Sequence, residues 1–218
     1  MPTATERIMV NGAWVDATLT VVGAAAPVEP TTTLTDNFDR TSSTSPGTAQ
    51  TGQVWRSEVG TWGTDGATIG SVTQADNDQV TADAGSYAVQ DVAATFVSGI
   101  GPDGYPALLL RWTGPDASVN DGYWLMVDPD GRTHLTRYPA FVDVVVASGV
   151  TVSGDVLRVR LVEDGTTTEA TIWRNGVQVG SGSDSGGPRS TGTRVGFRHG
   201  SGAAGLNIRW DDITVQTT

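Results

Sequence analysis

Apolar and polar residues alternate with a period of two along most of this chain, from Asp36 to Val215. In the segment Leu157–Leu161 the aliphatic residues fall on one face of an extended strand, and Arg158 and Arg160 fall on the other. No long segment shows the 3.6-residue period of an amphipathic helix. The pattern predicts an all-β protein in which two antiparallel sheets form a sandwich, with the first and last strands side by side.

Turn residues separate the alternating segments. Asp128-Pro129-Asp130-Gly131, Glu163-Asp164-Gly165-Thr166 and Arg174-Asn175-Gly176 each favour a tight reversal of the chain. A Trp-rich segment at 54–63 opens the main body. The further strands predicted are 68–73, 87–96, 107–112, 123–127, 133–138, 142–146, 156–162, 169–174, 177–179, 194–198 and 206–215.

The first 33 residues differ from the rest. Asn11-Gly12 between two apolar runs predicts a hairpin within residues 1–22. Residues 23–33 are rich in small residues, Pro and Thr and predict an extended linker, so the main domain is expected at 34–218. A hairpin of this size buries too little surface to be stable alone. We therefore expect it to dock through its apolar side chains, Ile8, Val10, Trp14 and Val15. Its own sandwich, a symmetry-related copy and a larger assembly are the alternatives for the docking partner, and the linker favours the last two.

Composition excludes several classes of function. A net charge of -11 with a pI near 4.4 disfavours nucleic acid as a partner. Cysteine is absent, which excludes disulfides and thiolate chemistry. No apolar run reaches the roughly 18–20 residues of a membrane span, and the N-terminus lacks the features of a secretory signal. We expect a protein made in the cytoplasm without export by the general pathway.

Several ordered segments resemble one superfamily. These are Asp36-Asn37-Phe38-Asp39-Arg40, Gly60-Thr61-Trp62, Asp121-Gly122-Tyr123-Trp124, the segment 154–160, the segment 173–179, and Trp210-Asp211-Asp212-Ile213-Thr214-Val215. Together they are similar to the concanavalin A-like, laminin G-like jelly roll over residues 34–217. Within it, the chain most resembles virion proteins of phages that infect actinobacteria, especially minor tail proteins. The leader around Val10–Asp16 resembles the start of such tail proteins.

This superfamily includes glycan hydrolases and non-catalytic binding modules, so fold alone does not choose between them. Retaining hydrolases need two carboxylates facing each other about 5–5.5 Å apart. Only Glu163 and Glu169 are near each other in sequence, and they flank a turn, where solvated side chains are expected. We predict no catalytic residues and no enzymatic activity. No cofactor is required, although Asp36 and Asp211 would be brought together by the terminal strands and offer oxygen ligands for a structural calcium ion.

For glycan binding, sugars stack on aromatic rings and bond to planar polar groups. Tyr105 fits this description, and the predicted ligand-binding residues are Arg111, Tyr123, Trp124, His134, Arg137 and Arg198. Alternation places either Tyr123 or Trp124 in the core and exposes the other. Five other tryptophans lie in apolar segments and are assigned to packing: Trp55, Trp62, Trp112, Trp173 and Trp210.

The sequence therefore predicts a non-enzymatic virion protein, a minor tail protein that displays a jelly roll for binding host cell-surface polysaccharide. Its other partners would be virion proteins held through the N-terminal arm, and a homotrimer is expected from the symmetry of tail structures. Two alternatives stay open: a capsid decoration or head-fibre protein with a purely structural role, and a glycan hydrolase of the concanavalin A-like superfamily.

Overall fold

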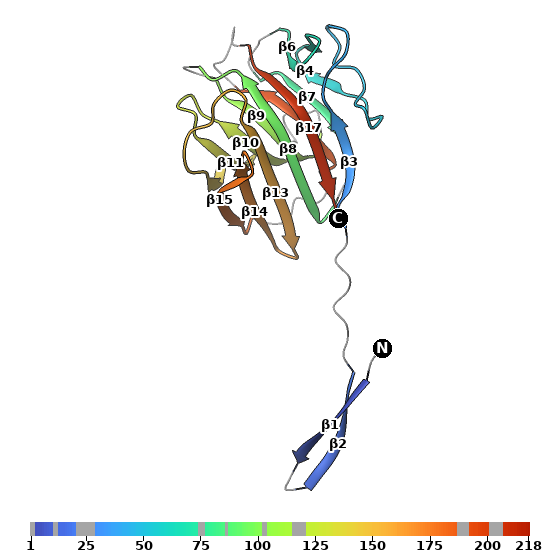
Figure 1. Cartoon of the computed structure of the whole chain (residues 1–218). Helices are drawn as coiled ribbons and strands as arrows, with labels where there is room; N and C mark the ends of the chain where they lie inside the picture. Colours follow the sequence, from blue (N-terminus) through green and yellow to red (C-terminus); the bar gives the residue numbers. More distant parts are fainter. Residues whose placement is uncertain are drawn as a thin grey trace.

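A computed structural model describes residues 29–73, 77–85, 87–101, 104–114, 121–186, 192–200 and 207–218, together with the backbone of 3–10 and 13–20. The body is a sandwich of two antiparallel sheets (Figure 1). One sheet contains β4 (Arg56–Val59), β7 (Gln79–Asp83), β9 (Pro106–Trp112), β10 (Gly122–Val127), β11 (Thr133–Tyr138), β12 (Val142–Val146) and β16 (Arg194–His199). This seven-stranded sheet has the order β12-β11-β10-β9-β16-β7-β4. The all-β sandwich predicted from the alternating pattern is confirmed.

The second sheet has eight strands. They are β3 (Thr31–Asp36), β5 (Trp62–Thr64), β6 (Ile69–Ser71), β8 (Val89–Ser98), β13 (Val156–Asp164), β14 (Thr167–Arg174), β15 (Val177–Asp184) and β17 (Arg209–Thr217). Seven follow the order β15-β14-β13-β8-β17-β6-β5, and β3 pairs with β17. Each paired strand in both sheets runs antiparallel to its neighbours, as hairpins and Greek-key connections require.

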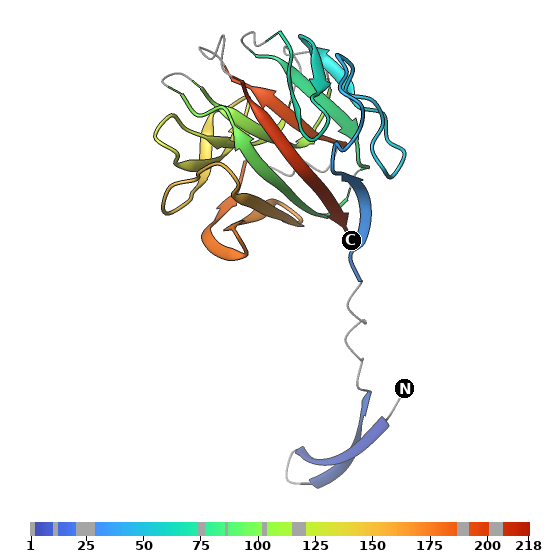
Figure 2. The same ribbon diagram turned by 45° about the horizontal axis from the view of Figure 1, so that its top comes forward.

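The terminal strands of the body meet. Ile213 in β17 lies opposite Asp36 in β3, and Thr217 lies opposite Thr31 (Figure 2). The prediction that the first and last strands are neighbours is confirmed. The domain begins earlier than expected, because Thr31, Thr32 and Thr33, which the sequence placed in the linker, belong to β3.

The sequence did not predict β7, the strand next to the edge strand β4. β7 pairs with both β16 and β4 in the seven-stranded sheet, yet its sequence, Gln-Val-Thr-Ala-Asp, contains few strongly apolar residues. The polar residues Gln79 and Thr81 are nevertheless buried. Burial here comes from neighbouring strands and loops rather than from the hydrophobicity of β7 itself.

Apolar side chains fill the space between the sheets. Phe197 lies at the centre of an aromatic group, with its ring centroid 5.8 Å from that of Trp55, 5.4 Å from that of Trp210 and 6.1 Å from that of Phe38. All four side chains are almost fully buried. The packing role predicted for Trp55 and Trp210 agrees with this position.

The leader contains β1 (Thr3–Val10) and β2 (Ala13–Thr20), which pair as an antiparallel hairpin and belong to neither sheet of the sandwich. Ile8 lies opposite Val15 in the register, and Met9 lies opposite Trp14. Asn11 and Gly12, the predicted turn, and the side chains of Ile8, Val10, Trp14 and Val15 lie outside what the structure describes. Within the described residues no helix has the length and apolar character needed to span a bilayer.

Candidate functional site

The outer face of the seven-stranded sheet, which points away from the core, carries a second apolar cluster. Alternation in β10 sends Tyr123, Leu125 and Val127 into the core, and Trp124 and Met126 to the outer face. Trp124 packs there with residues from β9 and β11: Ala107, Leu109, Trp112 and Tyr138. This choice between the two faces was left open by the sequence, and the tertiary structure decides it.

A hollow of about 240 Å³ lies beside this cluster. It is lined by aromatic, apolar and planar polar side chains: Asn77, Tyr105, Trp124, Met126, Phe141, Arg198 and Gly200. We call it the Trp124 hollow. Its volume is below the roughly 300–1,000 Å³ of pockets for drug-sized ligands, so it suits a single sugar unit.

Trp124 forms the floor of the hollow rather than an open platform. Tyr138 stacks on its ring with centroids 4.7 Å apart, and the Arg198 guanidinium lies over the ring at 4.4 Å. Only 7% of Trp124 is exposed. Because neighbours cover both faces of this indole, a ligand would meet its edge.

Phe141 is the exposed aromatic of the site, at 64%. Its ring makes edge contacts with Trp124 at 5.6 Å and with Tyr138 at 5.2 Å. Its backbone has φ of 52°, a conformation unusual for a bulky residue. The chain thus holds an aromatic ring at the rim of the hollow in a costly conformation. Sequence reasoning did not single out Phe141, although an aromatic in the short connection between two strands was the available signal.

Arg198 reaches the hollow from β16. Its Nη2 donates to Asn77 Oδ1 at 2.5 Å and its Nη1 to Gln79 Oε1 at 3.4 Å. Both partners are neutral amide oxygens. On the same strand Arg194 behaves differently, because it forms an ion pair with Glu58.

Two predicted ligand residues lie between the sheets instead. Tyr123 is fully buried and donates its hydroxyl to Asp184 Oδ2 at 2.9 Å. Arg111 is 1% exposed and pairs with Glu163. We therefore leave both out of the proposed site.

A local irregularity explains the position of Arg111. Its φ is 47°, and the pairing of β9 with β16 shifts register at this point, as in a β-bulge. The bulge reverses the alternation of β9, turning Arg111 inward and Trp112 outward. Strict alternation from the sequence could not reveal this.

The remaining candidates lie outside the hollow. Arg137 points inward on β11 and donates to Asp184 Oδ1 at 2.6 Å. His134 lies on the outer face, opposite Met126, with Nε2 2.8 Å from Asp128 Oδ2 and Nδ1 3.3 Å from Asp143 Oδ2. Arg137 is thus engaged in the interior, whereas His134 borders the site and is held by two carboxylates. Of the six predicted ligand residues, the hollow brings together Trp124 and Arg198.

The two glutamates weighed as a hydrolase pair do not face each other. Glu163 turns toward the core, where it pairs with Arg111, whereas Glu169 on β14 is exposed on the opposite face of the sheet. This arrangement cannot place an acid and a nucleophile on either side of one glycosidic bond.

Asp36 is engaged inside the domain. Its Oδ1 accepts from the Phe38 N–H at 3.0 Å, and its Oδ2 accepts from Trp55 Nε1 at 2.7 Å and pairs with Arg40. A carboxylate with these partners has little capacity left for calcium. Among the described residues no group of three or more His, Asp or Glu side chains is arranged to hold a metal ion.

Asp211, the other predicted calcium ligand, is partly buried on β17. Burial raises its pKa to about 6, with a further rise from the carboxylates of Asp212, Asp39 and Asp65. Between about pH 4 and pH 6 the folded chain therefore keeps a proton that the unfolded chain has lost. The contribution of Asp211 to the free energy of unfolding therefore falls as the pH rises through this window.

We expect Asp211→Asn to remove this pH dependence. The variant should be more stable than the parent at pH 7.5 and equally stable at pH 4, because asparagine mimics the protonated acid. Urea unfolding at the two pH values measures this. Asp130→Asn is the control. Hydrogen bonds in its turn lower the pKa of Asp130, so the ionised form of Asp130 stabilises the fold as the pH rises, which is opposite in sign to the effect of Asp211. Equal stability of the parent and Asp211→Asn at pH 7.5 would contradict the assignment.

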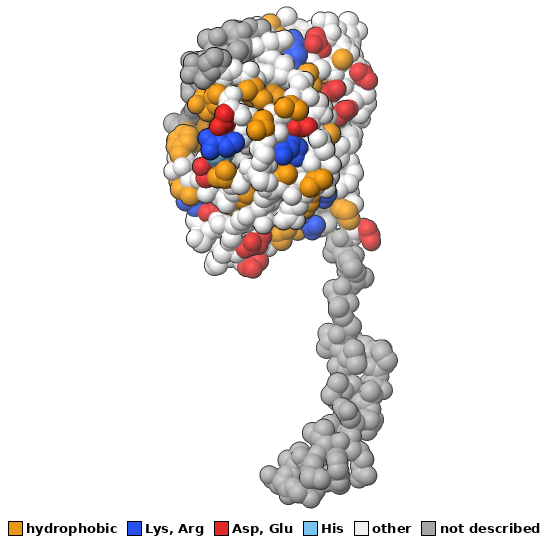
Figure 3. Space-filling view, turned by 60° about the vertical axis from the view of Figure 1, so that its left-hand side comes forward, with side chains coloured by type: hydrophobic (Ala, Val, Ile, Leu, Met, Phe, Trp, Pro, Cys, Tyr) orange, Lys and Arg blue, Asp and Glu red, His pale blue; other side chains and the backbone are white. Residues whose placement is uncertain are grey.

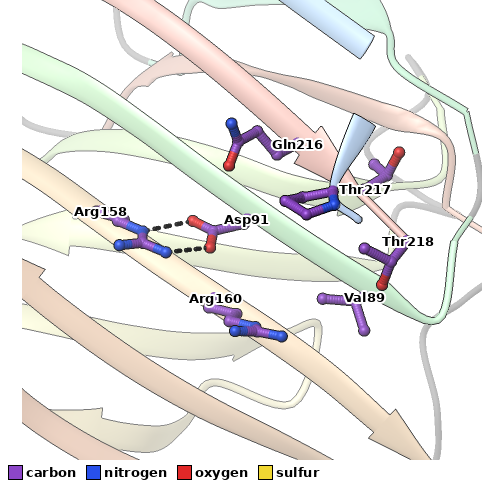
Figure 4. A pocket seen from close by; sticks show the side chains of 8 residues that line it. Val89, Asp91, Arg158, Arg160, Gln216, Thr217 and Thr218 are labelled. Atoms are coloured by element: carbon purple, nitrogen blue, oxygen red, sulfur yellow. Dashed lines mark hydrogen bonds and ion pairs between the residues drawn. The ribbon is translucent and has the colours of Figure 1, made fainter. Parts of the chain in front are cut away.

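A second hollow, of about 170 Å³, lies on the outer face of the eight-stranded sheet (Figure 4). Arg158 spans it and bonds to both carboxylate oxygens of Asp91, at 2.7 and 2.5 Å. Arg160, Gln216 and Thr218 complete much of its lining. No aromatic ring lines this hollow, so it lacks the stacking surface that sugars use.

Apolar side chains are also exposed at one side of the sandwich. Figure 3 turns forward the side on which β14 and β15 lie, and hydrophobic side chains appear there among arginines and acidic residues. Exposed valines include Val142 and Val146 on the edge strand β12 and Val177 on the edge strand β15.

No family model and no curated protein matches this chain in sequence. Solved structures resemble its fold. An endo-1,3-beta-glucanase from Streptomyces sioyaensis has 12% identity and a TM-score of 0.55, covering 90% of this chain and 100% of the other. The carbohydrate recognition domain of Emp47p has 13% identity and a TM-score of 0.52, covering 88% and 98%. The exoplasmic/lumenal domain of VIP36 in a Ca²⁺/Man3GlcNAc-bound form has 10% identity and a TM-score of 0.53, covering 76% and 83%.

A Bacillus subtilis protein described as having a galectin-like fold is also similar, with 16% identity and a TM-score of 0.50, covering 69% of this chain and 82% of the other. At these identities the likeness shows the fold alone. The jelly-roll sandwich predicted from the ordered segments is confirmed.

Proposed function

We propose that this protein binds glycans at the Trp124 hollow on the outer face of its seven-stranded sheet, without cleaving them. The observation that carries the proposal is a sugar-sized hollow whose rim holds an exposed Phe141 and whose wall holds the planar polar groups of Arg198 and Asn77. Stacking surface beside planar donors is what recognition of a sugar requires. The fold, shared with a carbohydrate recognition domain and with a glycan-bound domain, supports this reading.

The absence of a facing Glu163 and Glu169 pair favours binding over hydrolysis. The hydrolase alternative has its own support, since one structure of similar fold is a glucanase. Release of reducing sugar from a bound glycan would establish that alternative.

The binding test uses the full chain on a glycan array, followed by calorimetry with a glycan that it retains. We expect Phe141→Ala to weaken binding about tenfold, equivalent to about 1.4 kcal/mol, because the ring offers the accessible stacking surface. Val177→Ala is the matched control, because it removes an equally exposed apolar side chain on the other sheet. An array without any bound glycan, or unchanged affinity in Phe141→Ala, would reject the proposal.

We further propose that the domain is displayed on a phage particle, as a minor tail protein joined to other virion proteins through the hairpin β1–β2, in several copies. The resemblance of the leader supports this, as does a hairpin that forms a sheet of its own. A chain lacking residues 1–28, which keeps β3 intact, should retain glycan binding and fail to join particles. Incorporation of that shortened chain would contradict attachment through the hairpin, and a particle map would distinguish tail from capsid.

A further inference from the structure

The charge of Arg198 has no carboxylate partner among the described residues. Burial lowers the pKa of its guanidinium, an effect that Tyr138 partly offsets. An arginine still remains charged at neutral pH. The cation is instead held by the amide oxygens of Asn77 and Gln79 and by the face of Trp124. Withdrawing a charge from water without an opposite charge is costly, so a ligand that supplies one gains energy.

The guanidinium also has unused hydrogen-bonding capacity. It offers five N–H groups, and its hydrogen bonds to Gln79 and Asn77 use one from each terminal nitrogen. Its Nε is buried and finds no acceptor in the described part of the chain, so the N–H groups left for a ligand are those of the two terminal nitrogens. A carboxylate matches this planar fork better than any neutral group does.

The chain as a whole repels anions, with a net charge of -11. Several arginines elsewhere are paired with carboxylates: Arg194 with Glu58, Arg158 with Asp91, and Arg111 with Glu163. The hollow combines a cation that has no ion-pair partner in the described part of the chain with apolar walls from Phe141 and Tyr105. A site becomes specific when one of its polar groups can pair with one ligand and cannot pair with a competing ligand.

We propose that the Trp124 hollow selects a sugar unit that carries a carboxylate, a hexuronic acid, with the carboxylate bound by Arg198 and the ring against Phe141. This inference rests on the proposed glycan binding and adds the charge of the ligand. In a hexuronic acid the carboxylate is attached to the ring, so ring and carboxylate can reach adjacent aromatic and guanidinium groups together.

The test compares a hexuronic acid oligosaccharide with its methyl ester, which has the same backbone and no charge. The full chain should bind the acid at least tenfold more tightly than the ester, by calorimetry in low salt. Arg198→Gln should bind both forms with equal, weak affinity, and Arg198→Lys should keep part of the preference because it retains charge without the planar fork. Arg160→Gln, an equal change of charge on the other sheet, should behave as the parent does. Thermal melting confirms that each variant is folded.

The outcomes separate the two proposals. Equal binding of acid and ester by the parent would overturn the selection of a carboxylate and leave glycan binding in place. A preference that survives in Arg198→Gln, or that disappears in Arg160→Gln, would also overturn it. If neither form binds and the array is silent, glycan binding itself fails.

Discussion

Glu163→Ala is expected to lower the free energy of unfolding by about 3–5 kcal/mol, because it leaves the buried Arg111 guanidinium without its counter-charge. Arg111 is 1% exposed, and its Nη2 has two further contacts, with the Ala88 carbonyl oxygen at 2.8 Å and the Leu161 carbonyl oxygen at 3.5 Å. These carbonyl groups cannot replace a carboxylate. Typical domains are stable by about 5–15 kcal/mol, so the loss would be a large share of the total. Urea unfolding at pH 7 measures it.

Glu169→Ala is the matched control for this prediction. Glu169 has the same side chain on the adjoining strand β14 but points to solvent on the opposite face. Its removal should change stability by no more than about 0.5 kcal/mol, as at other exposed positions. Equal effects of the two variants would mean that Arg111 gains its stability from other contacts.

Phe197→Ala is expected to cost about 3–5 kcal/mol, the range for deleting a large buried aromatic. Its fully buried ring touches those of Trp55, Trp210 and Phe38, so the cavity would open at the centre of the core. The neighbouring rings are rigid and cannot close the space easily. Denaturant unfolding, with tryptophan fluorescence as the signal, would follow the loss.

Phe141→Ala provides the comparison, since it removes the same ring from an exposed position. Only its edge contacts with Trp124 and Tyr138 are lost, at a cost of about 1 kcal/mol or less. The two variants should therefore differ clearly in their loss of stability, because Phe197 supports the fold whereas Phe141 supports the binding of ligand. A large destabilisation by Phe141→Ala would contradict these separate roles of the two residues.

Much of the fold could be read from the chain because side chains alternate across a strand with a fixed period. Segments such as 133–138 and 142–146 match β11 and β12, and turn residues mark their ends. The strand β7 was not predicted because several of its residues are polar and become buried only through neighbours that lie far away in sequence. The bulge at Arg111 was not predicted because a local change in backbone direction does not alter the hydrophobic pattern of the sequence.

The candidate site was less accessible to sequence reasoning. Trp124 and Arg198 were identified by residue type, since sugars need aromatic rings and planar donors. Arg111 and Tyr123 have the same types and lie inside the domain. Phe141, in contrast, becomes part of the site only because its backbone turns the ring back over Trp124 and Tyr138. Residue type states what a side chain can bind, whereas exposure and direction decide whether it does so.

The sequence by itself determined an all-β sandwich whose ends meet, because alternation, turn residues and the lack of helical periodicity are local properties of the chain. Only the tertiary structure decided which face of β10 points outward, that Arg111 is neutralised by Glu163, and that no carboxylate of the described residues pairs with Arg198. These depend on which distant strands become neighbours and on one bulge in β9. Charge pairing and burial are set by such long-range contacts, and no local pattern encodes them.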